Sequence, residues 1–155
     1  MIKLMSIFSY RHEDREIVME ERNLEERPNA RTVLVVEDDM NVGSLLVSII
    51  EEELLYQVTL ASNAYEALAI VENTKPHLFI LDYQLPGMNG LQLYDHLHML
   101  PGFDQIPGLV ISANAPVNEI KKRHLWYLKK PFELNELLDV TERLVNQGKD
   151  HLQEV

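Results

Sequence analysis

Five short apolar runs, separated by segments of helical periodicity, constrain the fold of this chain more than any other feature. Each run is rich in branched or aromatic side chains, which is typical of strands buried on both faces of a sheet. The runs occupy residues 33–36, 58–61, 78–81, 108–111 and 125–128. Strands that alternate with helices form βαβ units with right-handed crossovers. The pattern therefore predicts an α/β fold with a five-stranded parallel sheet and helices on both of its faces.

Apolar side chains at helical spacing fill the intervening segments. We expect a helix over 42–50 after an Asn41 cap, one from 64 after an Asn63 cap, one over 91–97 and one over 134–144 that stops at Gly148. Gly43 interrupts the first helix at a cost of about 1 kcal/mol relative to alanine, and the sequence offers no local reason for it.

The first thirty residues differ in composition from the rest. Residues 11–27 are dense in Glu and Arg, and Tyr10, Ile17 and Leu24 recur at heptad spacing. This pattern fits either a short amphipathic helix or a solvated, partly disordered arm. The expected organisation is a charged arm over 1–30, one folded domain over 31–147 and a short polar tail over 148–155.

The composition excludes several classes of function. A formal net charge of -11 opposes non-specific nucleic-acid binding, because a phosphate backbone would be repelled over most of the surface. The absence of cysteine removes disulfides, thiolate nucleophiles and cysteine-ligated metals. No apolar stretch approaches the roughly 18 residues that a membrane helix needs. We expect a cytoplasmic protein that contacts neither nucleic acid nor membrane.

Polar residues follow four of the five predicted strands. They are Glu37, Asp38 and Asp39 after the first, Asp82 after the third, Ser112 after the fourth and Lys130 after the fifth. Because ligands bind at the carboxyl ends of strands in an open parallel sheet, these residues should meet at one rim. Crowded carboxylates need a cation, and oxygen ligands without His or Cys favour Mg²⁺. A carboxylate there can attack a phosphoryl group and form an acyl phosphate, while Lys130 and Ser112 contact other phosphoryl oxygens.

Four blocks resemble motifs of the response-regulator receiver domains of two-component signalling, in the same order. They are residues 35–39 (Val-Val-Glu-Asp-Asp), 81–90 (Leu-Asp-Tyr-Gln-Leu-Pro-Gly-Met-Asn-Gly), 110–113 (Val-Ile-Ser-Ala) and 128–132 (Leu-Lys-Lys-Pro-Phe). The resemblance covers roughly residues 32–145 and implies a flavodoxin-like sheet of order 2-1-3-4-5. It also implies a signalling phosphoacceptor like the single-domain chemotaxis regulators, which is not an enzyme in its own right.

The resemblance implies a role for each residue at the rim. Asp82 is the phosphoacceptor, and it holds Mg²⁺ together with Glu37, Asp38 and the backbone carbonyl of Gln84, whereas Asp39 is not a direct ligand. Lys130 and Ser112 contact the phosphoryl group. Pro131, expected in the cis form, favours Lys130 over its neighbour Lys129.

The resemblance extends to signalling. Ser112 and Tyr127 form the switch, in which the Tyr127 ring rotates inward as Ser112 moves toward the phosphoryl oxygens. Gln84 and Asn114 flank the phosphoryl group and tune its lifetime. The partners are a histidine kinase or phosphotransfer protein and a downstream protein that the sequence does not identify.

One departure from the family lies between Ser112 and Lys130. That stretch is about one helical turn shorter than is usual, so the fourth helix should be short or irregular. Trp126 stands where the family tends to have a small residue, and it could fill the space that the missing turn leaves. Output or dimerisation through this face is therefore not assumed, and the oligomeric state stays open.

Three functions remain for such a chain. Only a short polar tail follows Gln147, which suggests a stand-alone phosphoacceptor or a piece of a longer protein. The alternative is a pseudo-receiver that acts as a constitutive protein-interaction module, which the altered fourth helix allows and the complete rim disfavours. A Mg²⁺-dependent phosphohydrolase is least favoured, because such enzymes generally have a second acid two residues after the nucleophilic aspartate, where this chain has Gln84.

Overall fold

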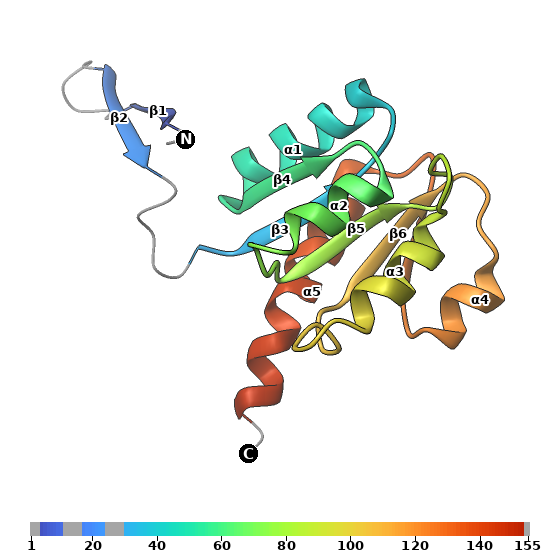
Figure 1. Cartoon of the computed structure of the whole chain (residues 1–155). Helices are drawn as coiled ribbons and strands as arrows, with labels where there is room; N and C mark the ends of the chain where they lie inside the picture. The colour runs from blue at the N-terminus through green and yellow to red at the C-terminus, as the bar shows by residue number, and fades with distance from the viewer. Residues whose placement is uncertain (1–3, 11–16, 24–29, 154–155) are drawn as a thin grey trace. The chain divides into compact units, whose positions relative to one another are not determined.

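The computed structural model describes residues 4–10, 17–23 and 30–153, and the chain divides into two compact units, Met1–Ala30 and Arg31–Val155. The first unit contains strands β1 (Leu4–Tyr10) and β2 (Ile17–Asn23), which pair antiparallel with Tyr10 opposite Ile17 (Figure 1). Of the two alternatives for this arm, the helix through Tyr10 and Ile17 is therefore wrong, and Leu24 lies outside the described residues. Branched and aromatic residues such as Ile7, Phe8 and Val18 favour extended backbone over helix.

The second unit is built on the predicted five-stranded parallel sheet. Its strands are β3 (Thr32–Val36), β4 (Gln57–Ala61), β5 (Leu78–Asp82), β6 (Gly108–Ser112) and β7 (Trp126–Lys129). They lie in the order β4-β3-β5-β6-β7, and every pair is parallel. Counted within this unit, the order is 2-1-3-4-5, which confirms the flavodoxin-like topology.

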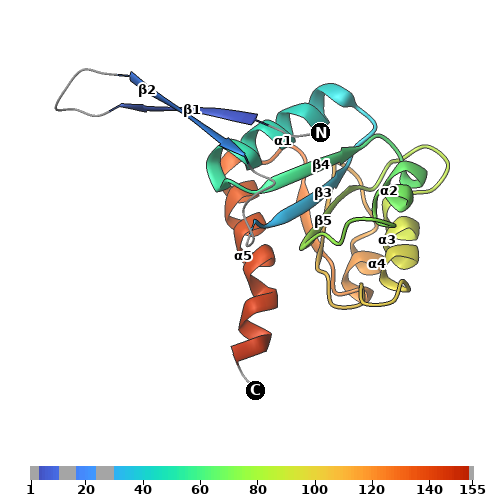
Figure 2. The same ribbon diagram turned by 60° about the vertical axis from the view of Figure 1, so that its left-hand side comes forward.

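Helices cover both faces of this sheet (Figure 1, Figure 2). They are α1 (Met40–Leu54), α2 (Ala64–Ile70), α3 (Gly90–His98), α4 (Val117–Lys122) and α5 (Leu134–Gln153). One core cluster joins α1 and α5 to the sheet, and the other joins α2, α3 and α4 to it. The two clusters account for the uninterrupted apolar character of β5 and β6, which are buried along their whole length.

Two predicted helix boundaries are wrong, and one is confirmed. Asp39, not Asn41, caps α1, because its side chain accepts hydrogen bonds from the Asn41 and Val42 amides. Asn63 caps α2 as predicted. α5 continues past Gly148 to Gln153, since one glycine costs a helix only about 1 kcal/mol.

The tertiary structure supplies the reason for Gly43 that the sequence lacked. Gly43 is buried on α1, and a Cβ at this position would lie 2.8 Å from a methyl carbon of Leu60 on β4. The missing side chain therefore lets the helix pack closely on the edge strand.

The fourth helix is short, as predicted, with six residues. Trp126 does not fill the space beside it: the residue is 39% exposed, and the Arg143 guanidinium lies 5.8 Å from its ring centroid. Leu125 is buried instead, in the same apolar cluster as Ile120, and it occupies the space that a Cβ on Gly108 would need. The strand begins at Trp126, one residue later than predicted, so Leu125 lies just before it.

Candidate functional site

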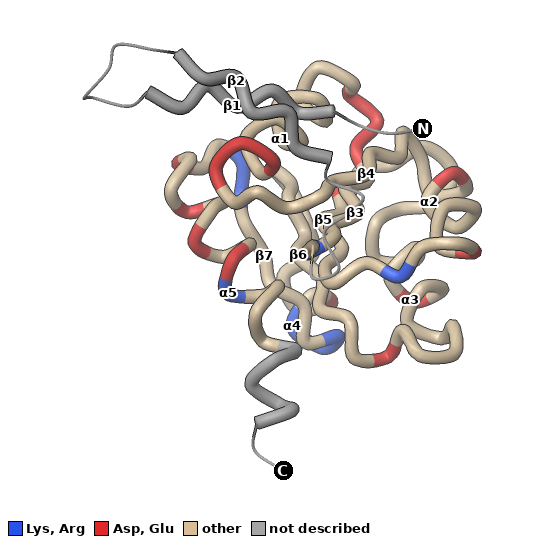
Figure 3. The backbone as a smooth tube through the Cα atoms, turned by 90° about the vertical axis from the view of Figure 1, so that its left-hand side faces the viewer, with Lys and Arg blue, Asp and Glu red and all other residues tan. Residues whose placement is uncertain are grey.

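Three carboxylates gather at the carboxyl ends of two adjacent strands. Glu37 and Asp38 follow β3, Asp82 ends β5, and one oxygen from each lies within 4.8 Å of the others. Glu37 and Asp82 are buried, at 3% and 8% exposure, while Asp38 is exposed. Asp and Glu residues also occur along α1, α2 and α5 (red in Figure 3), so proximity rather than charge alone distinguishes this cluster.

Lys130 is the cation that the fold brings to this cluster. Its Nζ lies 3.4 Å from Glu37 Oε2, although 93 residues separate the two in sequence. The Lys130 amide also donates to the Ser112 carbonyl over 3.1 Å, which fixes the start of the loop after β7. Lys129 ends β7 and is exposed, and the Lys130–Pro131 peptide bond is cis as predicted. The structure thus places Lys130, and not Lys129, at the cluster.

The electrostatics of the cluster favour the binding of a further cation. Burial, and then the charge of Asp82, raises the pKa of Glu37 to about 7, against an ordinary value of 4.5, although Lys130 opposes the shift. Burial likewise raises the pKa of Asp82, opposed by Lys130 and by the Gln84 amide. Two buried carboxylates that share one lysine are therefore hard to ionise together. An all-oxygen donor set of this kind fits a hard divalent ion such as Mg²⁺.

Ser112 ends β6, the strand next to Asp82, and is 2% exposed. Its hydroxyl donates to the Asn114 carbonyl over 3.3 Å, within its own loop. Its own carbonyl accepts from the Tyr127 hydroxyl over 3.0 Å and from the Lys130 amide. The structure therefore links the two predicted switch residues through the Ser112 backbone.

The loop after β5 shapes the other side of the site. The Gln84 amide donates to Asp82 Oδ1 over 3.2 Å, which holds the carboxylate at the strand end, and Gly87 has a positive φ of 80°. The Gly90 amide donates to the Tyr83 carbonyl over 2.9 Å. A Cβ on Gly90 would collide with the backbone carbonyl of Asp82, so only glycine lets α3 begin so close to the phosphoacceptor candidate. The metal-binding role of the Gln84 carbonyl stays a prediction.

Asp39 has a part in the site that the motif alone does not reveal. Its amide donates to Glu37 Oε1 over 3.2 Å while its side chain caps α1. One residue thus anchors the helix and orients a candidate metal ligand. Its position directly before a helical pattern, where aspartate is a preferred cap, is the sequence signal that could have indicated this.

The comparisons with known proteins point to one family. The family model of the response regulator receiver domain matches residues 33–142. Sporulation initiation phosphotransferase F of Bacillus subtilis is 27% identical over 115 residues, which are 72% of this chain and 90% of that protein. An uncharacterised 14.6 kDa protein of Leptolyngbya boryana is 34% identical over 119 residues, which are 74% of this chain and 87% of that protein.

Solved structures show the same fold. A CheY-like response regulator receiver domain protein from Methanospirillum hungatei matches with a TM-score of 0.70 and 28% identity, over 79% of this chain and 99% of that chain. A putative response regulator from Chloroflexus aurantiacus matches with a TM-score of 0.69 and 27% identity, over 76% of this chain and 98% of that chain.

Among the described residues, no helix is both long and apolar enough to cross a membrane.

Proposed function

This chain belongs to the response regulator receiver domain family of two-component systems, and on that premise we propose that Asp82 accepts a phosphoryl group from a histidine kinase or phosphotransfer protein. The observation that carries the proposal is the meeting of Asp82 with Glu37, Asp38 and Lys130 at one rim of the sheet. A site that accepts a phosphoryl group needs a nucleophile, a place for a metal and a positive charge, and these four side chains offer all three.

In the proposed reaction, an Asp82 carboxylate oxygen attacks phosphorus, and the bond from phosphorus to the donor atom breaks as the acyl phosphate forms. Transfer of this kind depends mainly on position and charge neutralisation. The Gln84 amide restricts the Asp82 carboxylate, and Lys130, next to Glu37, would contact an incoming phosphoryl oxygen. The Ser112 hydroxyl would give up its hydrogen bond to the Asn114 carbonyl and donate one to another phosphoryl oxygen.

Glu37, Asp38, Asp82 and the Gln84 carbonyl would hold Mg²⁺. The ion would neutralise negative charge on the phosphoryl oxygens and on the buried carboxylates. The raised pKa values of Glu37 and Asp82 support this assignment, because a divalent ion relieves the same repulsion that makes them hard to ionise.

Phosphorylation would act through Ser112 and Tyr127. If the Ser112 hydroxyl turns toward the phosphoryl group, the loop after β6 moves and the Tyr127 ring, now half-buried, changes its packing against the core. The chain has a single tryptophan, Trp126, directly before Tyr127. Its fluorescence is therefore a natural reporter of this change.

The test is phosphorylation of the full chain by a small acyl phosphate in the presence of Mg²⁺. We expect one acid-stable, base-labile phosphoryl group per chain, seen by intact-mass spectrometry, and none in Asp82→Asn. Asp104→Asn, an exposed carboxylate elsewhere, is the matched control and should be phosphorylated normally. Lys130→Ala should bind Mg²⁺ but lose the phosphorylation-dependent change in Trp126 fluorescence.

The second candidate, a constitutive interaction module of the pseudo-receiver type, rests on the six-residue α4. It predicts no phosphoryl uptake and no Mg²⁺ binding. Uptake that persists in Asp82→Asn would contradict both functions as assigned to this site.

A further inference from the structure

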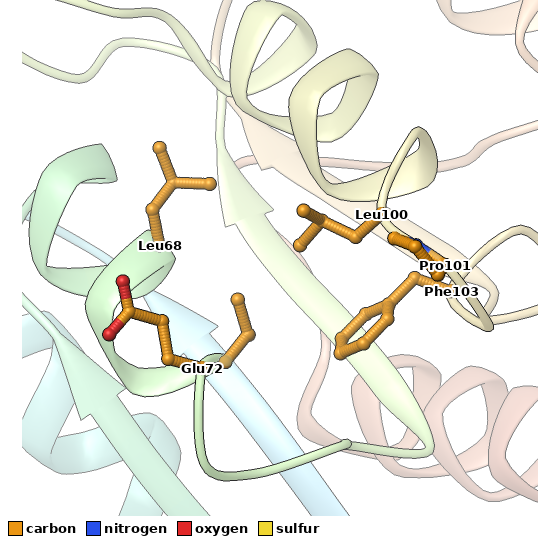
Figure 4. Close-up of a pocket in the computed structure, with 6 residues that line it drawn as sticks. Leu68, Glu72, Leu100, Pro101 and Phe103 are labelled. Atoms are coloured by element: carbon orange, nitrogen blue, oxygen red, sulfur yellow. The ribbon is translucent and has the colours of Figure 1, made fainter.

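An apolar groove lies between the end of α2 and the segment that follows α3 (Figure 4). It has a volume of about 330 Å³ and is lined by Leu68, Val71, Glu72, Leu100, Pro101 and Phe103. One side is formed by the end of α2 and the other by the segment between α3 and β6. Those two segments lead into the first residues of β5 and β6, whereas Asp82 and Ser112 are the last residues of the same strands. The groove is therefore separate from the proposed phosphorylation site.

Some residues that line the groove are buried in the core, and others are exposed to solvent. Phe103 is 9% exposed and stacks on Phe79 of β5, with ring centroids 6.4 Å apart. Val71 is 6% exposed. Met99, beside the lining residue Leu100, is 85% exposed. The lining thus runs from buried Val71 and Phe103 to exposed Pro101, which is typical of a contact surface rather than of core.

The groove has one acidic and one basic side chain beside it. Glu72 lines it at the end of α2, while the Lys75 Nζ lies 6.0 Å from the Phe103 ring centroid and close to Gly102. A ligand that fits must bring an apolar surface with a positive group toward Glu72 and a negative group toward Lys75. Such a pair of charges would also fix its orientation.

The strands near the groove limit the backbone of that ligand. β5 and β6 are interior strands of the sheet, each paired on both sides. Neither strand therefore offers an unpaired edge, and an extended peptide could not add to the sheet there. An α-helix satisfies its own backbone hydrogen bonds and therefore needs none from these strands.

We propose that this groove binds an amphipathic α-helix of a partner protein, with bulky apolar side chains one turn apart as anchors, a basic residue facing Glu72 and an acidic residue facing Lys75. The apolar anchors would fill the space between Leu68 and Leu100. This contact does not require phosphorylation of Asp82, so it would give the protein a docking surface independent of the proposed switch.

The test uses a stapled helical peptide with Leu and Phe one turn apart, flanked by one Arg and one Glu in the stated orientation, and a second peptide with the two charges exchanged. Titration of the labelled peptides with the full chain, followed by fluorescence anisotropy, should show saturable binding and a preference for the first peptide. Leu100→Glu should weaken binding by about tenfold or more, because a charge would enter the apolar floor. Leu45→Glu, at a 60% exposed position on α1, is the control and should bind normally.

The charge assignment has its own test. The double variant E72K/K75E should invert the preference between the two peptides. Pro101→Glu, at an exposed lining position, replaces Leu100→Glu if the latter unfolds in urea at a lower concentration than the control.

Several results would overturn the proposal. They are failure of both peptides to bind at millimolar concentration, equal binding by Leu100→Glu, or an unchanged preference in the double variant. Self-association of the chain that Leu100→Glu abolishes, without peptide binding, would assign the groove to a second copy and also contradict the proposal. Phosphorylation of Asp82 should be the same in all of these variants, so the two hypotheses fail separately.

Discussion

The Tyr127 hydroxyl donates a hydrogen bond to the Ser112 carbonyl over 3.0 Å, and the Lys130 amide donates to the same oxygen over 3.1 Å. A single backbone carbonyl thus connects the proposed switch residues and the lysine of the site. Any movement of Ser112 must alter both bonds, so the β6 and β7 loops should move together.

Tyr127→Phe removes one of these two bonds and leaves the aromatic ring in place. We expect the free energy of unfolding to fall by about 0.5–1.5 kcal/mol, the usual value of one hydrogen bond. Urea denaturation measures the change. Tyr65→Phe, at a 64% exposed position, is the control and should have a smaller effect. Equal losses in the two variants would show that the Tyr127 hydroxyl bond does not stabilise the fold.

The stability of the protein should depend on pH through Glu37. Its pKa is about 7 in the folded protein against an ordinary 4.5, so the folded protein favours the protonated form. This contribution is complete below pH 4.5 and is lost as the pH rises toward 7. Without divalent ions, we therefore expect stability to decline across that interval.

Glu37→Gln should make that decline smaller, leaving the part that comes from the raised pKa of Asp82. Mg²⁺ should oppose the decline in the unmodified protein, because the ion binds the ionised carboxylates. Thermal unfolding at several pH values, with Mg²⁺ or with a chelator, measures both effects, and Glu52→Gln on the exposed side of α1 is the control. A pH profile unaltered by Glu37→Gln would contradict the assignment.

Two glycine substitutions should differ sharply in their effect on the free energy of unfolding. Gly90→Ala would force a Cβ against the Asp82 backbone carbonyl, and it should destabilise the protein by about 1–3 kcal/mol or more. Gly43→Ala meets only the Leu60 side chain, which can turn, and the better helix propensity of alanine offsets up to about 1 kcal/mol of the cost. Urea denaturation of the two variants compares them directly. A loss at position 43 as large as at position 90 would contradict the difference between backbone and side-chain contact.

The short helix α4 should depend on Arg123. Its Nε and Nη2 donate to the two Asp95 oxygens over 2.8 and 2.9 Å, and its Nη1 donates to the Glu119 carbonyl over 2.9 Å. A double-mutant cycle of Arg123→Ala and Asp95→Ala should give a coupling energy of about 0.2–1 kcal/mol, since both groups are partly exposed. The coupling should fall at high salt. Zero coupling at low salt would mean that this pair does not hold α4 to α3.

The sequence by itself determined the parallel sheet, its strand order through the family resemblance, and the positions of Glu37, Asp38, Asp82, Ser112 and Lys130 at the strand ends. Strand periodicity and the rule that ligands bind at carboxyl ends are local and topological, so they can be applied before any contact is known. The same local argument placed the cap of α2 at Asn63 correctly and that of α1 wrongly at Asn41, because Asp39 and Asn41 are both suitable cap residues.

Other features depended on contacts between residues far apart in the chain, which no local pattern contains. Gly43 is explained by Leu60, Gly90 by the Asp82 carbonyl, and the exposure of Trp126 by its place on an edge strand. The same holds for the bond from Tyr127 to Ser112 and for the groove between Leu68 and Leu100. In each case the tertiary structure decided the outcome, because close packing of side chains, and not the propensity of any one segment, determines which atoms meet.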